Sequence, residues 1–497
     1  MTELFESEDV HDRRLVRDPS GLLGRFNVAG LLEAADVHVA RRLCAILGED
    51  DEGVALALGL AVRAVRHGSV CVDLAAVADS LPELPWPVRD GWLARVAASP
   101  VAAASVLRVE HDLVYLDRYW REEGQVRDDL LARAARPAPP VDVARLEAGA
   151  VRIFPAGYDE QRAAAHAAAT RWTTVLTGGP GTGKTTTVAG LLALLAEQSP
   201  TPLRIALSAP TGKAAARLQE AVADATAALG REDRDRLGPL TAQTLHRLLG
   251  WRPGSSTRFR HHRGNRLPHD VVVVDEASMV SLTMMARLVE SVRGDARLLL
   301  VGDPDQLASV EAGAVLSDLV SGLDERAPGA VAALRTSHRF GARIGALAEA
   351  LRLGDATGTQ VAWGPQWYAG RPLLVTANDY GLGLFNGDTG VVVADGDGVR
   401  AVVAGVGQHL SFATSRLSEV QTMHAMTIHK SQGSQADEVT VLLPPEDSPL
   451  LTRELFYTAV TRAQSVVRVV ATEAAVRAAV ANRAQRATGL RRRLAAT

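Results

Sequence analysis

The chain has 497 residues, a net charge of −3 and 47% hydrophobic residues. At about 150 residues per domain, this length predicts roughly three domains. The composition excludes a disordered or fibrous protein. The near-zero charge excludes a protein that attracts nucleic acid through its overall field, so any such binding needs a local basic groove.

The cysteine content and the hydropathy pattern bear on location. Only Cys44 and Cys71 are cysteines. We therefore expect no disulfide framework, and we expect the protein to be cytoplasmic. The acidic first residues contain no apolar signal region. No apolar run reaches the length of a membrane span. We therefore expect no contact with a membrane.

Lysine is almost absent from the chain. Of the 54 basic residues, only Lys184, Lys213 and Lys430 are lysines, and the rest are arginines. A compact ammonium and a planar guanidinium are not interchangeable at a phosphate or nucleic-acid site. The three lysines are therefore predicted to mark functional positions, against the alternative that they are chance survivors.

Residues 1–140 are predicted to be mostly helical, because apolar residues recur at helical spacing in segments such as VHVARRLCAILGED. This part contains no catalytic constellation and is interpreted as a partner-docking domain. The segment Ala135–Ala144, ARPAPPVDVA, has three prolines among small residues and is predicted to be a linker.

A glycine-rich loop follows an apolar strand and precedes a helix in the segment TVLTGGPGTGKTTTVAG. Residues Gly178 to Thr185 fit the pattern G-x-x-x-x-G-K-[ST], in which backbone N–H groups surround a phosphate chain. Lys184 is expected to reach the β- and γ-phosphates, and the Thr185 hydroxyl to hold Mg²⁺. A chance glycine loop is the alternative, and the flanking strand and helix argue against it. The loop predicts binding of a nucleoside triphosphate.

From Tyr158 onward, strands alternate with helices, which predicts a parallel sheet covered by helices. Asp275 and Glu276 end a strand of four valines, and Gln306 follows the next apolar strand. Ligands bind at the carboxyl ends of such strands. Asp275 is predicted to hold Mg²⁺, Glu276 to accept a proton from the attacking water, and Gln306 to sense the γ-phosphate.

After residue 371, short β runs separated by Asn-Gly and Asp-Gly turns predict a small antiparallel barrel or sheet over about 376–420. Helical segments then return. Two arginines of this half, Arg339 and Arg462, are candidates for stabilising the transferred phosphoryl group. The last residues, ANRAQRATGLRRRLAAT, are interpreted as the solvated end of a helix.

The ordered motifs resemble those of superfamily-one helicases, most closely the RecD family, the α subunits of bacterial exodeoxyribonuclease V (RecBCD). The matching segments lie in order between Gln161 and Arg462: GGPGTGKTTT, APTGKAAARL, TLHRLLG, VVVDEASM, VGDPDQLASVEAGAVL, HRF, NDYGLGLFNGD, AMTIHKSQGS and ELFYTAVTRA. The resemblance is weaker before residue 140. It implies two RecA-like motor domains, at 150–334 and 335–497, with the β insertion in the second.

The resemblance also implies roles for individual residues. Gln161 matches the position that contacts adenine. The nucleotide-binding residues implied are Gln161, Gly178, Gly179, Pro180, Gly181, Thr182, Gly183, Lys184, Thr185 and Thr186. Arg339 and Arg462 match the arginines that the second motor domain offers to the γ-phosphate. The residues implied in binding DNA, or in linking DNA to nucleotide, are Pro210, Thr211, Lys213, Thr244, His246, Thr427, His429, Lys430, Ser431 and Gln432.

The function implied is an ATP- and Mg²⁺-dependent 5′→3′ helicase on single-stranded DNA and duplex ends, in a heterotrimer with RecB-like and RecC-like subunits that processes double-strand breaks for recombinational repair. No nuclease metal cluster is visible in the sequence, so DNA cleavage is assigned to a partner. Two alternatives are a free-standing RecD-like helicase and a scaffold subunit with a spent ATP site. One feature departs from the family: RecD-like proteins carry a longer segment between Arg339 and WYAGRPLLVT. Either this chain is shortened there or residues are missing at about 354–366 of this sequence, and we favour the second.

Overall fold

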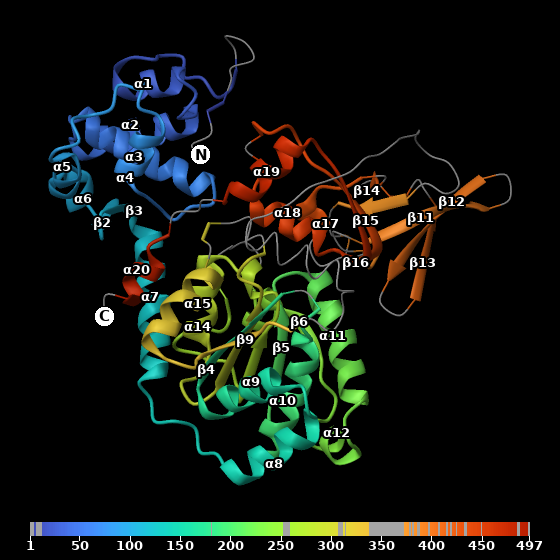
Figure 1. Cartoon of the computed structure of the whole chain (residues 1–497). Helices are drawn as coiled ribbons and strands as arrows, with labels where there is room; N and C mark the ends of the chain where they lie inside the picture. The colour runs from blue at the N-terminus through green and yellow to red at the C-terminus, as the bar shows by residue number, and fades with distance from the viewer. Residues whose placement is uncertain are drawn as a thin grey trace.

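The structure is a computed structural model, shown in Figure 1. It describes residues 4–5, 12–179, 181–251, 259–306, 312–313, 315–336, 372–376, 379, 382–384, 388–395, 398–405, 408–413, 416–417, 420–423, 425–431, 435–448, 450–484 and 488–495. No helix in this part of the chain is both long and apolar enough to cross a membrane.

The N-terminal region is a helical unit with a small sheet, close to the prediction. Its helices are α1 (Gly21–Val28), α2 (Ala34–Leu47), α3 (Glu52–Arg66), α4 (Leu74–Ser80), α5 (Trp92–Ala98) and α6 (Pro100–Ala103). Three antiparallel strands pair in the order β1 (Cys71–Val72), β3 (Leu113–Leu116) and β2 (Leu107–Glu110). Phe26, Leu56, Leu58 and Trp92 are among the residues that form a core of its own.

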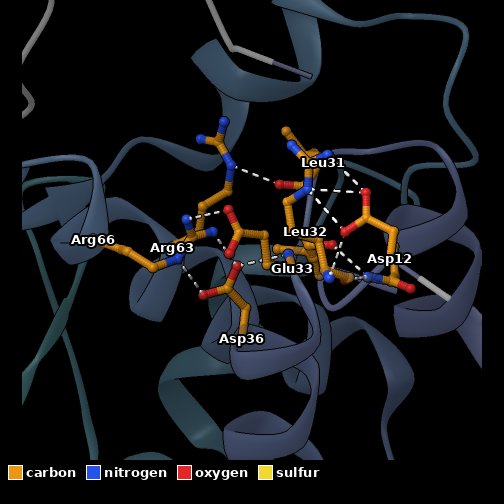
Figure 2. A network of polar contacts seen from close by, with 9 residues as sticks. Asp12, Leu31, Leu32, Glu33, Asp36, Arg63 and Arg66 are labelled. Carbon is orange, nitrogen blue, oxygen red and sulfur yellow. Dashed lines mark hydrogen bonds and ion pairs between the residues drawn. The ribbon is translucent and has the colours of Figure 1, made fainter. Parts of the chain in front are cut away.

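A polar network fixes the start of α2 to the end of α3 in this region (Figure 2). The Asp36 carboxylate is fully buried, accepts a hydrogen bond from the backbone N–H of Glu33 at 2.9 Å and pairs with Arg66 at 2.7 Å. Arg66 also pairs with Glu33 at 2.6 Å, and Arg63 donates to the Leu31 carbonyl at 2.7 Å. A buried carboxylate is tolerated because charged and neutral donors surround it.

The centre of the molecule is a six-stranded parallel sheet in the order β6-β5-β7-β8-β4-β9. The strands are β4 (Thr173–Gly178), β5 (Ile205–Ala209), β6 (Ala242–Thr244), β7 (Val271–Val274), β8 (Arg297–Gly302) and β9 (Val331–Leu334). Along β7, Val272 and Val274 face one core while Val271 and Val273 face another. Both faces of β7 are therefore buried, which explains why its sequence is apolar throughout and does not alternate with polar residues.

Helices cover both faces of this sheet, as predicted. One face carries α8 (Val143–Ile153), α9 (Asp159–Thr170), α10 (Lys184–Gln198), α11 (Gly212–Ala227) and α12 (Arg231–Leu237). The other carries α7 (Asp117–Ala134), α13 (Leu245–Leu249), α14 (Leu282–Ser291) and α15 (Val315–Arg326), with a 3-10 turn η1 (Ala277–Met279). Thus α7 leaves the N-terminal region and packs through Val126 and Leu130 into the core of the central sheet.

The C-terminal helix α20 (Leu490–Ala495) returns to the N-terminal half and lies beside α7 and α15 (Figure 1). The interpretation of the last residues as a solvated helix end is wrong. Arg493 is 1% exposed and lies within 2.6 Å of Glu110 and 3.2 Å of Glu123. Its guanidinium also stacks on Tyr115 and Trp120. A desolvated arginine is stable here because two carboxylates and two aromatic faces receive it.

The antiparallel sheet expected after residue 371 is confirmed, and its closure into a barrel is not. Five strands pair in the order β13 (Gln408–Ala413), β12 (Gly398–Gly405), β11 (Thr389–Asp395), β10 (Pro372–Val375) and β14 (Val420–Thr422). Within the described residues, β13 and β14 are the two edges and do not pair with each other. Buried residues such as Leu373, Val392, Ala401 and Val403 form the core of this sheet.

The last part of the chain pairs β15 (Ala436–Leu442) and β16 (Ala463–Val470) in parallel. Three helices accompany them, α17 (Ile428–Ser431), α18 (Arg453–Val460) and α19 (Glu473–Ala481). The stretch in which we predict missing residues, about 354–366, lies outside the described residues.

Replacing Arg493 with alanine should destabilise the fold by about 3–5 kcal/mol, because Glu123 then remains buried without its counter-charge. Arg492→Ala is a matched control from the same helix. The Arg492 side chain is 51% exposed, so its removal should change the free energy of unfolding by less than about 1 kcal/mol. Thermal or denaturant unfolding measures both variants, and equal effects would contradict the assignment.

Asp318 should make stability depend on pH. Burial, reinforced by the nearby Glu123, raises the pKa of Asp318 to about 7, although Thr488 donates to it at 2.7 Å. The folded chain thus holds this proton more tightly than the unfolded chain, and stability falls as pH rises toward 7. Asp318→Asn keeps an acceptor oxygen but does not ionise. Its unfolding temperature should therefore rise relative to wild type between pH 5 and pH 8, whereas a constant difference would refute the assignment.

Candidate nucleotide and DNA site

The glycine-rich loop lies between β4 and α10, at the carboxyl edge of the central sheet. Gly181 and Gly183 adopt φ values of 82° and 80°, which favour glycine over residues with a side chain. Thr182 donates to the Gly179 carbonyl at 2.9 Å and folds the loop on itself. The N-terminus of a 15-residue helix, α10, therefore opens onto the loop, an arrangement suited to anions.

The Lys184 ammonium is held inside the loop. It donates to the carbonyl of Gly178 at 2.5 Å and to that of Gly179 at 3.1 Å. Both acceptors are neutral, so the positive charge has no carboxylate among these hydrogen-bond partners. A phosphate placed over the loop would therefore meet an ammonium group that is already positioned.

Asp275 and Glu276 lie beside the loop, directly after β7. Removal from bulk water, followed by the repulsion of Glu276, raises the pKa of Asp275 to about 7, while Lys184 opposes the shift. Glu276 has φ +50°, a left-handed conformation that costs a non-glycine residue about 1–2 kcal/mol. Strain of this kind is typical of functional sites.

The turn after β8 brings in Gln306 and contacts the C-terminal half. Gln306 donates through Nε2 to Asp303 at 3.0 Å and accepts at Oε1 from Arg462 at 3.2 Å. Tyr457 donates its hydroxyl to the same Asp303 carboxylate at 3.2 Å. Arg462 is 6% exposed, and burial lowers its pKa. The structure thus brings the predicted Gln306 and Arg462 together across the two halves.

One cavity of about 770 Å³ unites these groups. Its polar lining comes from the loop, from the ends of β7 and β8, from α11 and from the C-terminal half. The lining includes Gly181, Gly183, Lys184, Thr185, Thr186, Arg217, Asp275, Glu276, Gln306, Gln435 and Arg462. A cavity lined by basic groups from both halves and by carboxylates has the chemistry to hold a triphosphate with a cation.

A second hollow of about 280 Å³ adjoins the loop on the side of α9. Gln161, which is 3% exposed, lines it together with Phe154, Tyr158 and Thr186. Gly183 borders both cavities. An apolar hollow with one buried amide beside a phosphate loop has the composition of a site for a planar base.

The residues expected to line the DNA path in the first half lie at the ends of neighbouring strands. Pro210 and Thr211 follow β5, and Thr244 ends β6. The Thr211 and Thr244 hydroxyls cap the next helices by accepting from Ala214 and Arg247. Lys213 is partly buried, and burial lowers its pKa, while Arg217 acts in the same direction. The His246 ring packs against Phe259 in a tilted arrangement, with 6.0 Å between the ring centroids.

In the second half, Thr427, His429 and Ser431 lie at or within α17, and the Ser431 hydroxyl donates to the Ile428 carbonyl at 2.7 Å. Pro180, Arg339 and Gln432 lie outside the described residues, as does the side chain of Lys430. These four predictions therefore have no structural counterpart to report.

Four residues of the site were not predicted as site residues. Arg217 and Gln435 line the large cavity, and Asp303 and Tyr457 connect the two halves. Arg217, Asp303 and Tyr457 lie inside the motifs quoted above, and Gln435 directly follows one of them, so the motif map held a signal for them. Asp303 directly follows β8, just as Asp275 directly follows β7. The strand-end rule that predicted Asp275 therefore applies to Asp303 as well. Tyr457 lies within a helix and has no strand-end position to add to this signal, and aromatic residues are common in buried helices.

Oxygen donors suited to Mg²⁺ line the large cavity in the Thr185 hydroxyl and the Asp275 carboxylate. Mg²⁺ keeps several waters and needs only one or two protein oxygens, so this pair fits it. Among the described residues, no group of three or more histidine, cysteine, aspartate or glutamate side chains is arranged to hold a metal ion by itself.

Three family models match separate parts of the chain. Residues 28–113 match the N-terminal domain of the RecBCD enzyme subunit RecD. Residues 161–312 match an AAA domain, and residues 422–470 match a UvrD-like helicase C-terminal domain. The matches cover, in order, the N-terminal unit, the central sheet with its phosphate loop, and a stretch that includes β15 and Arg462.

Curated relatives extend over nearly the whole chain. The RecBCD enzyme subunit RecD of Mycolicibacterium smegmatis is 57% identical over 556 residues, covering 94% of this chain and 98% of the relative. That of Mycobacterium tuberculosis H37Rv is 54% identical over 573 residues, covering 97% and 98%. The ATP-dependent RecD2 DNA helicase of Deinococcus radiodurans is 32% identical, covering 74% of this chain and 56% of that protein. The first two alignments exceed the 497 residues of this chain, so both relatives contain residues that it lacks.

Glu276→Gly should yield a chain that is more stable than Glu276→Ala by about 1 kcal/mol, because only glycine relieves the left-handed backbone. Both variants lose the carboxylate and should lose ATP hydrolysis. Thermal unfolding and a phosphate-release assay measure the two effects. An alanine variant as stable as the glycine variant would show that position 276 is not strained.

Proposed function

This chain belongs to the family of the RecBCD enzyme subunit RecD, and on that premise we propose that it is an ATP-driven DNA helicase. In this proposal it moves 5′→3′ along single-stranded DNA as one subunit of a helicase–nuclease complex that processes double-strand ends. The observation that carries the proposal is the cavity in which Lys184, Asp275, Glu276 and Gln306 of one half meet Arg462 of the other.

The proposed mechanism assigns each group of the cavity a role. Lys184 and the loop N–H groups bind the phosphates, and Gln161 contacts the base. Thr185 and Asp275 would hold Mg²⁺, which neutralises charge on the phosphate oxygens. Glu276 accepts a proton from the attacking water. Gln306, Arg462 and Arg339 face the γ-phosphate, where an arginine stabilises the developing charge.

Domain organisation follows from this assignment. We assign residues 1–140 to partner docking, 150–334 to the first motor domain and 335–497 to the second. ATP binding in the cleft closes the motor domains on each other, and hydrolysis reopens them. Pro210, Thr211, Lys213, Thr244 and His246 contact DNA from the first domain. Thr427, His429, Lys430, Ser431 and Gln432 contact it from the second, so that closure moves one contact relative to the other.

Proposed partners are RecB-like and RecC-like subunits. The assignment of these partners is supported by the alignments. This chain aligns along 98% of the length of the two RecD subunits but along only 56% of the length of the RecD2 helicase. A free-standing helicase is therefore the second candidate. A scaffold role with a spent site is disfavoured by the presence of Lys184, Thr185, Asp275, Glu276 and Gln306 around one cavity.

DNA cleavage is assigned to a partner. The two buried free cysteines support a reducing cytoplasm as the location.

Lys184→Ala should lower the ATPase rate stimulated by single-stranded DNA at least about 100-fold, since it removes the one preorganised cation of the loop. DNA binding without nucleotide should persist and serves as the control for folding. Full ATPase activity in the variant would refute the assignment of the site.

Unwinding of duplexes with a 5′ or a 3′ tail tests the direction of movement. A preference for the 5′ tail is expected, and a preference for the 3′ tail would overturn the proposed polarity. Co-purification with two larger subunits separates the subunit from the free-standing helicase.

A further inference from the structure

Two hydrogen bonds between described residues join the two halves of the cleft, and they lie only a few residues apart along each segment. On one side is the turn Asp303–Gln306 after β8, and on the other the segment Tyr457–Arg462 that ends α18. Tyr457 donates to Asp303 and Arg462 donates to Gln306. We call this pair of hydrogen bonds the two-point contact. Tyr457 and Asp303 have no role in the mechanism above.

The Asp303 carboxylate costs free energy to bury, so its burial requires hydrogen-bond donors around it. It is 2% exposed, and burial raises its pKa above the usual range while Lys184 opposes the shift. Its oxygens accept from the Asp305 N–H at 3.1 Å, from Gln306 at 3.0 Å and from Tyr457 at 3.2 Å. A carboxylate without water is retained only where donors replace the water.

The chemistry of Asp303 decides which way the Gln306 amide points. An ionised carboxylate only accepts hydrogen bonds, so it binds the NH₂ side of the amide. The amide oxygen must then point away from Asp303, and it accepts from Arg462. If the amide flipped, two acceptor oxygens would face each other at Asp303, and two donors would face each other at Arg462.

Tyr457 completes this arrangement from the opposite half. It is 4% exposed, and its ring lies in the core with Phe456 and Val460. A Cβ atom added to Gly179 would lie 3.1 Å from its hydroxyl, so the hydroxyl lies against the phosphate loop. Arg462 is tied to the same helix through Nε and the Thr458 carbonyl at 3.0 Å. Tyr457 and Arg462 therefore reach the turn together or not at all.

We propose that Asp303 and Tyr457 are positioning residues: Asp303 turns the oxygen of the Gln306 amide toward the nucleotide cavity, and Tyr457 fixes the Asp303 carboxylate while the second half is docked on the first. An incoming γ-phosphate competes for Arg462 and frees this oxygen, which then accepts a hydrogen bond from the attacking water. The inference rests on the proposed function and adds to it the link by which domain closure switches Gln306 on.

Tyr457→Phe tests the proposal, because it removes the hydroxyl and leaves the ring in its core. In the full chain with saturating single-stranded DNA, we expect kcat for ATP hydrolysis to fall about tenfold. KM for ATP should stay within about twofold, since the phosphate-binding groups are unchanged. Tyr115→Phe, a buried tyrosine of the N-terminal region, is the matched control and should hydrolyse ATP at the wild-type rate.

A double-mutant cycle separates positioning from general damage. Asp303→Asn replaces one of the two acceptor oxygens of the carboxylate with an NH₂ donor, so the Gln306 amide is no longer fixed in one orientation. This variant should lower kcat more than Tyr457→Phe does. Adding Tyr457→Phe to Asp303→Asn should then lower kcat by less than twofold. The inference would be overturned if the losses of kcat multiplied in the double variant. A wild-type kcat for Tyr457→Phe would also overturn it, as would a rise in KM as large as the fall in kcat.

The unmodified chain distinguishes this inference from the proposed function. If its ATPase is stimulated by single-stranded DNA and Lys184→Ala abolishes it, a negative result with Tyr457→Phe refutes the inference alone. If the unmodified chain shows no such ATPase, the proposed function fails and the inference fails with it.

Discussion

The structure of the cleft depends on burying ionised groups while giving each of them hydrogen-bond partners. Asp303 and Arg462 are both nearly inaccessible to solvent, and one amide, Gln306, separates them. Each would be costly to bury singly. The six-stranded parallel sheet makes the arrangement possible, because it brings the ends of β4, β7 and β8 to one edge and lets backbone and side-chain donors converge there. A site of this kind is stable when both halves are present.

The same constraint recurs far from the cleft, where α20 meets α7. Glu123 is fully buried, and burial raises its pKa although Arg493 opposes the shift. Thr488 and the Gly489 N–H complete its hydrogen bonds at 2.9 and 3.0 Å. The Thr488 hydroxyl also lies 2.7 Å from an oxygen of Asp318 in α15, so three elements far apart in sequence share one polar cluster. Its ion pairs join residues more than 360 positions apart along the chain.

Local patterns predicted the parts of the molecule that short segments determine. The glycine loop, the four-valine strand and the acids after it follow from spacing within about a dozen residues, and the parallel sheet follows from their order. The Arg493 cluster could not be predicted, because in an arginine-rich chain neither composition nor helical spacing distinguishes Arg493 from the exposed Arg492. Its environment comes from Glu110, Glu123 and Trp120. Tyr457 was missed for a similar reason, since its partner Asp303 lies 154 residues away.

These two buried clusters hold the C-terminal half to the rest of the chain in different ways. The contact at the cleft consists of single hydrogen bonds to Asp303 and Gln306, and a bound phosphate can compete with Gln306 for Arg462. The contact at α20 is a desolvated ion pair between Arg493 and two glutamates, which nothing in the reaction replaces. In the proposed reaction cycle, Arg462 therefore exchanges Gln306 for the phosphate while the ion pairs of Arg493 persist.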